Sequence, residues 1–253
     1  MSNKIIDTFN IKNKSINIGF IVAGFPNIDF TRNFLKHLDD TSIDILEIGI
    51  PYSDPIADGK LISEASFEAC QSGVTTDTVF DTLISEKSNI NKPLVFLVYY
   101  NLIFAYGIDN FIKKSIEAKI SGIIVPDLPY EEAEEFVTKL RNVGISFIPL
   151  VSVTSGNRIP KLVSQGDGFI YAIGSLGVTG TKPVSLDRLK HFVEEIKKSA
   201  NLPVALGFGI KNNNDVNVLR NYADGVIIGT SIVNLTKTDN LNITIDGINN
   251  LFK

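Results

Sequence analysis

The sequence predicts an α/β fold, a single (β/α)8 TIM barrel that spans residues 1–253 as one domain. Three observations predict it: the chain has 253 residues, its apolar runs are short and rich in β-branched residues, and amphipathic helical patterns separate them. This length is typical of one such barrel. Because two ordinary domains would also fit the length, the regular alternation of strand and helix patterns decides for the barrel.

Eight apolar runs are expected to form the strands. They are residues 16–22, 43–48, 94–98, 122–125, 145–151, 168–173, 203–206 and 225–228. Their apolar character is nearly continuous and does not alternate with polar residues, which is typical of parallel strands covered on both faces. Helical patterns between them include residues 29–38, 131–143, 186–198 and 214–222, with Asp29 as the expected N-cap of the first.

An open, doubly wound sheet is the rival arrangement. It rarely needs eight strand–helix units, and no G-x-G-x-x-G motif follows the first strand. The units after the second and sixth strands are longer than the others. Extra length in a barrel enters the βα loops at the catalytic face, so we expect extended loops after strands 2 and 6.

Composition excludes several classes of function. The net charge is −4 and Lys and Arg are not clustered, so no nucleic-acid partner is expected. A lone cysteine, Cys70, cannot form an intrachain disulfide and fits a reducing compartment. No signal-peptide pattern or long apolar run occurs, which predicts a cytoplasmic protein without a membrane partner. The two histidines, His37 and His191, fall in helical patterns and predict no metal site.

Glu47 interrupts the apolar second strand. Side chains alternate across a strand, so Glu47 shares a face with Ile45 and Gly49, while the other face must pack against helices. We therefore expect Glu47 inside the barrel near its carboxyl-terminal mouth, where burial raises the pKa of a carboxyl group and suits it to acid/base catalysis. The alternative is a buried carboxylate paired with Lys or Arg, and only Lys92 and Lys211 lie near strand ends.

Asp58 follows Glu47 in a loop that contains two prolines and ends in a glycine. The prolines stiffen this loop and Gly59 permits a sharp turn, so the Asp58 carboxylate could return over the mouth towards Glu47. The alternative is that Asp58 caps the helix that begins near Leu61. Asp54 fits a cap or a surface contact better than a catalyst. Two carboxylates over one pocket predict proton transfer on an organic substrate.

Three glycine-rich loops predict a phosphate site. Strand 7 leads into Gly207-Phe208-Gly209-Ile210, strand 8 leads into Gly229-Thr230, and the loop after strand 6 contains Gly177-Val178-Thr179-Gly180. Loops after strands 7 and 8 commonly bind phosphate in these barrels, because glycines let backbone N–H groups approach the oxygens. The alternative is that these glycines only permit tight turns.

Other side chains at strand ends are candidates for the pocket wall. Tyr99 shares the face of Leu97 on strand 3, and Phe20 lies on strand 1. Tyr171 on strand 6 can hydrogen-bond a neighbouring carboxylate through its hydroxyl group. Asp127 after strand 4 is a helix cap, a functional carboxylate or an interface residue, and the sequence does not separate these.

At this point the chain resembles the family of tryptophan synthase alpha subunits. The residues that carry the resemblance are the run 46–59, Gly24 and Pro26, Tyr99 and Asn101, Val125-Pro126-Asp127-Leu128-Pro129, Gly177-Val178-Thr179-Gly180, Gly207-Phe208-Gly209-Ile210 and Ala223-Asp224-Gly225 with Gly229. The run 46–59 is the specific part, since related phosphate-binding barrels share the last two segments. Lys60, Phe25, Gly174-Ser175 and Thr230 depart from the usual pattern, and none of these changes removes a catalytic group.

The resemblance implies a lyase of L-tryptophan biosynthesis that cleaves indole-3-glycerol phosphate by a retro-aldol step to indole and glyceraldehyde 3-phosphate. It implies that Glu47 is the acid/base, that Asp58 binds the indole N–H, and that Tyr171 supports both. The remaining implied substrate contacts are an indole pocket of Phe20, Leu97, Tyr99 and Phe208, and a phosphate site of Gly180, Gly209, Gly229 and Thr230. Thr179 would bind substrate from a loop that closes and excludes water from the reacting pair.

The resemblance also implies a partner. Alpha subunits of this family bind a beta subunit that carries pyridoxal phosphate, in an α2β2 heterotetramer, and this chain itself would hold no cofactor and no metal. Asp54 and Asn101 would lie at the interface. Two alternatives remain, a free-standing lyase that releases indole without a partner and a catalytically silent barrel that only activates one. A phosphosugar isomerase suits the acidic pair and the apolar wall less well.

Overall fold

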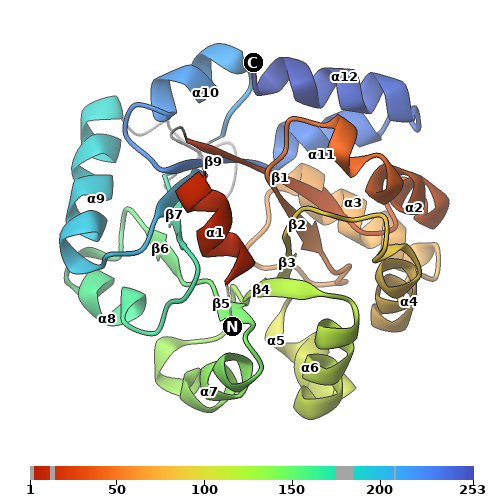
Figure 1. Cartoon of the computed structure of the whole chain (residues 1–253), viewed down its shortest axis with the longest axis horizontal. Coiled ribbons are helices and arrows are strands. Elements are labelled where there is room, and N and C mark those ends of the chain that lie inside the picture. Colours follow the sequence, from red (N-terminus) through yellow and green to blue (C-terminus); the bar gives the residue numbers. More distant parts are fainter. Residues whose placement is uncertain (1–2, 12–14, 175–184, 208) are drawn as a thin grey trace.

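The computed structural model describes residues 3–11, 15–174, 185–207 and 209–253. Parallel strands form a ring at the centre of the molecule, helices surround the ring, and the N-terminal helix lies across the near end of the barrel (Figure 1). Thr179, Gly180 and Phe208 lie outside the described residues, as does most of the predicted loop after strand 6. None of the described helices is both long and apolar enough to cross a membrane.

The strands occupy the eight predicted positions, with the fifth divided in two. They are β1 (Ile16–Val22), β2 (Ile45–Gly49), β3 (Leu94–Leu97), β4 (Ile120–Ile124), β5 (Ser146–Phe147), β6 (Leu150–Ser152), β7 (Ile170–Ile173), β8 (Val204–Gly207) and β9 (Gly225–Ile228). Their order in the sheet is β5-β4-β3-β2-β1-β9-β8-β7-β6, and every pair is parallel.

The division of the fifth strand closes the barrel. β5 pairs with β4 and β6 pairs with β7, so the two edges of the sheet are consecutive in the chain. Pro149 between them has no N–H to donate to a ladder. Backbone bonds continue through the break, since Ile148 N donates to Ile123 O at 2.9 Å and Tyr171 N donates to Pro149 O at 3.0 Å. The result is the closed eight-stranded barrel that the sequence predicts.

The helices fill the spaces between successive strands. They are α1 (Lys4–Ile11), α2 (Ile28–Lys36), α3 (Lys60–Gln71), α4 (Thr76–Glu86), α5 (Tyr100–Tyr106), α6 (Ile108–Glu117), α7 (Glu134–Asn142), α8 (Ile159–Val163), α9 (Leu186–Ser199), α10 (Asn213–Leu219), α11 (Thr230–Thr236) and α12 (Leu241–Leu251). Short 3₁₀ helices cover Leu38–Asp40, Tyr130–Glu132 and Gly156–Arg158. The extra length after β2 forms the segment 50–59 and the additional helix α3.

The predicted N-cap of α2 is wrong by two residues. Asn27 caps this helix, because its side-chain oxygen accepts from Phe30 N at 2.7 Å. Asp29 lies in the first turn, where its charge still favours the helix dipole.

Apolar side chains fill the lumen at the amino-terminal end of the barrel. Ile16, Ile18, Ile45 and Val95 are at most 1 % exposed and form one cluster inside the ring. Ile5 of α1 is fully buried against this cluster and covers the amino-terminal end of the barrel. Because all strands are parallel, their carboxyl ends meet at the opposite mouth, which is where polar side chains can gather.

Candidate active site

Glu47 lies inside the barrel on β2, as the alternation of side chains predicts. Its strand neighbours in register are Phe20 on β1 and Val95 on β3. Glu47 is 1 % exposed, and both carboxylate oxygens are buried without a hydrogen-bond partner among the described residues. The alternative of a carboxylate paired with Lys or Arg is therefore not supported by that part of the chain. Burial, reinforced by the nearby charge of Asp58, raises the pKa of Glu47 to about 8.

Asp58 is held over the mouth by Tyr99. The Tyr99 hydroxyl group donates to Asp58 Oδ2 at 2.9 Å and accepts from Ala57 N at 3.0 Å. Burial raises the pKa of the Asp58 carboxyl group, while the bond from Tyr99 lowers it by favouring the charged form. α3 begins at Lys60 with Gly59 at its N-cap and no side-chain cap, so Asp58 does not cap this helix.

The segment 50–59 is also anchored at its beginning. Tyr52 N donates to Ser66 Oγ at 2.8 Å, and Ser66 Oγ donates to Tyr52 O at 2.9 Å. The Tyr52 ring packs against Tyr99 with 5.0 Å between the ring centroids. Tyr99 thus contacts both ends of the segment. The sequence places Tyr99 only in the pocket wall, because its contacts with residues 52 and 57 depend on the path of the loop.

Tyr171 lies on β7, close enough to Glu47 and Asp58 for their charges to affect its hydroxyl group. Burial, followed by the charges of Glu47 and Asp58, raises the pKa of its hydroxyl well above the ordinary value. A β-carbon on Gly207 would lie 3.0 Å from Tyr171 Cε1, so the glycine leaves room for this ring. Since Glu47 has no hydrogen-bond partner among the described residues, Tyr171 is near this carboxyl group without a bond to it.

Phe20 forms an apolar wall beside Glu47. Phe20 is 4 % exposed, and a β-carbon on Gly49 would lie 2.8 Å from its Cζ, so only glycine at position 49 leaves space for the ring. Leu97 pairs with Gly49 in register and is partly buried on the same side. A β-carbon on Gly229 would lie 3.5 Å from Phe20 Cδ1, which places the turn after β9 against the same ring.

The glycine turns after β8 and β9 lie next to each other. The Ser231 hydroxyl group donates to Ile210 O at 2.5 Å and joins them. Gly209 has a φ of +30°, and no atom of the described residues lies within 4 Å of the β-carbon that another residue would have there, so that part of the chain leaves space beside its backbone. Thr230 begins α11 and is partly exposed. Exposed backbone of this kind suits an anion.

The predicted interface residues lie on the outer side of the same mouth. Asn101 on α5 is exposed and its amide donates to the Tyr52 hydroxyl at 3.5 Å. Asp54 is exposed in the segment 50–59. Asp127 has a structural role that the sequence left open, because its Oδ1 accepts from Tyr100 N at 2.8 Å at the start of α5.

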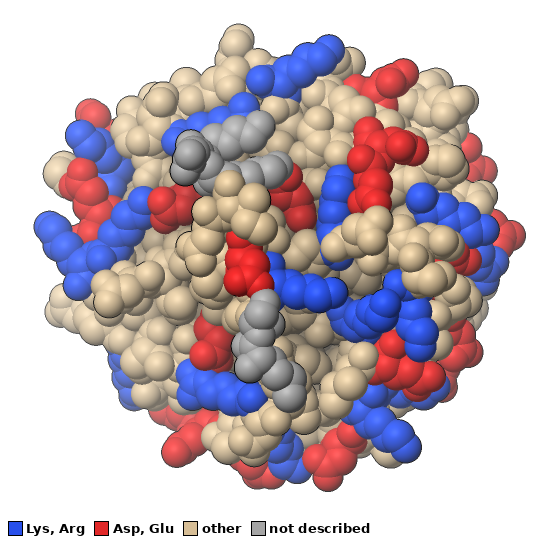
Figure 2. All heavy atoms as spheres, in the orientation of Figure 1, with Lys and Arg blue, Asp and Glu red and all other residues tan. Residues whose placement is uncertain are grey.

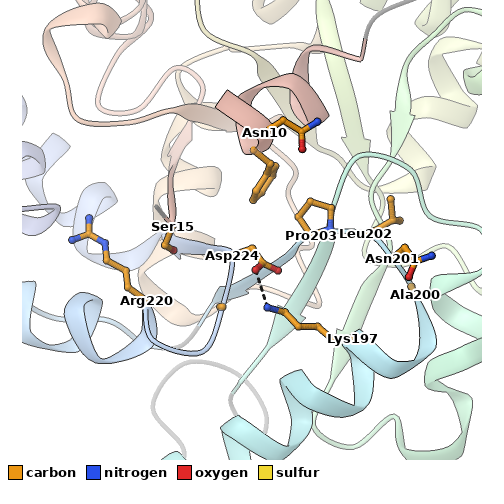
Figure 3. Close-up of a pocket in the computed structure, with 11 residues that line it drawn as sticks. Asn10, Ser15, Lys197, Ala200, Asn201, Leu202, Pro203, Arg220 and Asp224 are labelled. Atoms are coloured by element: carbon orange, nitrogen blue, oxygen red, sulfur yellow. Dashed lines mark hydrogen bonds and ion pairs between the residues drawn. The ribbon is translucent and has the colours of Figure 1, made fainter. Parts of the chain in front are cut away.

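A groove of about 710 Å³ opens at the amino-terminal face, opposite the mouth. Its charged side chains already have partners. Lys197 bonds to Asp224 at 2.8 Å (Figure 3). Arg220 donates to Asn17 Oδ1 and to the Phe252 carbonyl group. Acidic and basic side chains are interspersed over this face (Figure 2). The charged side chains that line the groove are Lys197, Arg220 and Asp224. In the part of the chain that the structure describes, no cluster of His, Cys, Asp and Glu could hold a metal ion.

Comparisons with known proteins agree on one family. Residues 6–249 match the family model described as tryptophan synthase alpha chain. A tryptophan synthase alpha chain of Campylobacter jejuni subsp. doylei is 45% identical over 250 residues, which cover 98% of this chain and 100% of the relative.

Solved structures agree with the sequence matches. The tryptophan synthase subunit alpha from Campylobacter jejuni has a TM-score of 0.87 at 44% identity, with 96% of this chain and 98% of that chain covered. A Mycobacterium tuberculosis tryptophan synthase structure has a TM-score of 0.91 at 27% identity, with 99% of this chain and 97% of that chain covered.

The buried carboxyl group of Glu47 should destabilise the fold as the pH rises. The pKa of Glu47 is raised from 4.5 to about 8, so between these values the folded state keeps a proton that the unfolded state has released, and stability falls with increasing pH. Glu47→Gln removes this effect. We expect the variant to be more stable than the parent by ~3 kcal/mol at neutral pH, with little difference near pH 4.5.

Urea unfolding of both proteins at several pH values measures this difference. A gap in the free energy of unfolding that stays constant from acidic to mildly alkaline pH would show that Glu47 ionises normally. Asp54→Asn, at an exposed position of the same loop, serves as the control and should show no such growing gap.

Proposed function

The chain belongs to the tryptophan synthase alpha chain family, and on that premise we propose that Glu47 and Asp58 carry out its reaction. The reaction is the cleavage of indole-3-glycerol phosphate to indole and glyceraldehyde 3-phosphate, a lyase step of tryptophan biosynthesis. The observation that carries the proposal is the buried carboxyl group of Glu47, which has no hydrogen-bond partner among the described residues, beside an Asp58 carboxylate that Tyr99 positions.

Glu47 acts first as an acid and then as a base. With its pKa raised to about 8, this carboxyl group still holds a proton near neutral pH and can deliver it to ring carbon C3. The resulting carboxylate takes the proton from the hydroxyl group on the glycerol carbon attached to C3. The bond between these two carbons then breaks, and its electron pair returns to the indole ring. One proton enters and one leaves, so Glu47 ends the reaction protonated.

Asp58 stabilises the positive charge that C3 protonation places on the ring. Its carboxylate would accept a hydrogen bond from the indole N–H, where that charge is partly located. The bond from Tyr99 favours the ionised form of Asp58 and fixes its direction. Tyr171 supports the pair by excluding water from one side and by offering its hydroxyl group to a carboxylate when substrate is bound.

The remaining predicted contacts fall into two groups, one for the indole end of the substrate and one for its phosphate end. We assign the indole end to Phe20, Leu97 and Tyr99, together with Phe208, and closure over the substrate to the loop with Thr179; Phe208 and Thr179 lie outside the described residues. We assign binding of the phosphate to the backbone of Gly209, Gly229 and Thr230, with Gly180 from the loop after β7. The adjacency of the turns after β8 and β9 supports this assignment. Fixing both ends would place C3 against Glu47.

Tryptophan synthase alpha chains act with a beta subunit. We propose an α2β2 heterotetramer in the cytoplasm, in which this single-domain chain holds no cofactor and the beta subunit carries pyridoxal phosphate. Asp54 and Asn101 would lie at the interface. The neighbouring surface supports docking, because Ile56 on the segment 50–59 is 76% exposed and Phe104 on α5 is 69% exposed. Burial of such apolar side chains by a partner is favourable.

Replacing either carboxyl group should abolish most of the activity. Glu47→Gln and Asp58→Asn are each expected to lower kcat for indole release by at least about 100-fold, because each removes a proton donor or a charge that acts in the transition state. The measurement is steady-state indole formation from indole-3-glycerol phosphate. Asp54→Asn is the matched control, and near-parental turnover by either carboxyl variant would remove that residue from the mechanism.

Addition of a beta subunit separates the proposed function from its alternatives. We expect weak indole release by the isolated chain and at least about tenfold faster release with a tryptophan synthase beta subunit, because docking on the segment 50–59 would order the loop that carries Asp58. High activity alone, unchanged by the partner, would indicate a free-standing lyase. A chain that is inactive in both conditions yet accelerates the beta reaction would be a silent activator.

A charge placed at Gly209 tests the phosphate end. Gly209→Asp should weaken binding of glycerol 3-phosphate, a competitive ligand, by at least about tenfold, because a carboxylate at this position would repel the anion. Gly209→Ala controls for backbone strain at positive φ, and its added methyl group meets open space. Calorimetric titration measures both. Unchanged affinity in the Asp variant would place the phosphate elsewhere.

A further inference from the structure

We propose that Lys211 provides a cationic contact for the substrate phosphate and so contributes to substrate affinity. The inference rests on the proposed function, since it adds a residue to the phosphate end of the same site. Lys211 is one of the two basic residues that the sequence places near strand ends. The backbone contacts proposed for the phosphate give its side chain no role. The other, Lys92, bonds to the carbonyl groups of Leu38 and Thr41.

Lys211 borders the same cavity as Thr230. This cavity has a volume of about 570 Å³ and is lined by the segment 211–213, the first two turns of α11 from Thr230 to Leu235, Leu61 at the start of α3, and one face of α12. The bond from Ser231 to Ile210 O joins the two turns that border it. An exposed lysine at the rim can therefore extend towards the turn that begins with Gly229, because its side chain is long and flexible.

The Lys211 ammonium group is available for a ligand. Among the described residues no hydrogen bond or ion pair occupies it, whereas the ammonium groups of Lys139, Lys161 and Lys197 each bond to a carboxylate at 2.7 to 2.9 Å. Along the sequence, the carboxylate nearest to Lys211 is that of Asp215. It accepts hydrogen bonds from the backbone N–H groups of Lys211 and Asn212 at 2.9 and 3.3 Å. Asp215 thus serves the N-cap of α10 and offsets the lysine charge only in part.

The distribution of charge around the mouth shows what this ammonium group would do. The exposed or partly exposed carboxylates of Asp54, Asp58 and Asp127 follow β2 and β4. A phosphate dianion approaching that half of the mouth meets like charges, while on the β8 and β9 half it meets Lys211. This distribution of charge favours the substrate orientation in which the phosphate lies away from the reacting carboxyl groups. Lys211 therefore acts on affinity and orientation, not on the chemical step.

The test compares three variants of the full chain. Lys211→Gln removes the charge, Lys211→Arg retains it, and Lys237→Gln removes an equal charge at the other end of α11, where Lys237 is exposed and follows the last helical turn. We expect Lys211→Gln to raise KM for indole-3-glycerol phosphate by about threefold to tenfold with kcat unchanged, since the contact is equal in the ground and transition states. Lys211→Arg and Lys237→Gln should retain the parental KM.

Two further measurements make the result specific. Lys211→Gln should lower the affinity for glycerol 3-phosphate by a similar factor and leave the affinity for indole unchanged. The difference in glycerol 3-phosphate affinity between variant and parent should shrink as the salt concentration rises. Parental affinity of Lys211→Gln for glycerol 3-phosphate, or an equal loss in Lys237→Gln, would overturn the proposal. If Gly209→Asp weakens this ligand while Lys211→Gln does not, the phosphate site stands and only the role of Lys211 fails. If neither variant weakens it, the phosphate assignment fails as well.

Discussion

The desolvation of one carboxyl group is the constraint on which the site depends. Glu47 lies on a strand whose other lumen-facing neighbours are apolar, and its oxygens have no hydrogen-bond partner among the described residues. A carboxyl group in such surroundings keeps its proton near neutral pH. This arrangement opposes stability, because the fold would tolerate a neutral side chain better. It suits the acid/base role proposed for Glu47, because an acid that is also a competent base needs a pKa close to the working pH.

The closed parallel barrel makes this burial possible. Because every strand runs in the same direction, the amino-terminal half of the lumen is filled by isoleucine and valine and is covered by Ile5 of α1. The polar groups are left at one mouth. Closure at the divided fifth strand leaves the backbone paired across Pro149, so the wall around Glu47 remains continuous. An open sheet would expose one side of the carboxyl group and lose the shift in its pKa.

Polar ties set the position of the second carboxyl group. Asp58 lies on a loop, where chain flexibility would otherwise spread its carboxylate over many positions. The Tyr99 hydroxyl group bonds to both Asp58 and Ala57, and Ser66 holds Tyr52 at the other end of the segment. The same loop carries exposed Ile56 and Asp54. A partner that docks on this surface would contact the segment that holds Asp58, the carboxylate proposed to act on the indole ring, and so could couple binding to activity directly.

The sequence by itself determined the positions of the strands and the inward direction of Glu47, because both follow from local periodicity. One expectation about a cap was wrong, because Asn27 instead of Asp29 caps α2; the alternative that Asp58 caps α3 is also not supported, since Gly59 is the N-cap there. Only the tertiary structure decided that Asp127 caps α5, that Tyr99 positions Asp58, and that Gly49 must lack a side chain for Phe20 to fit. Each of these joins residues from different strands or loops. Such contacts depend on barrel closure and loop path, which no pattern within one segment encodes.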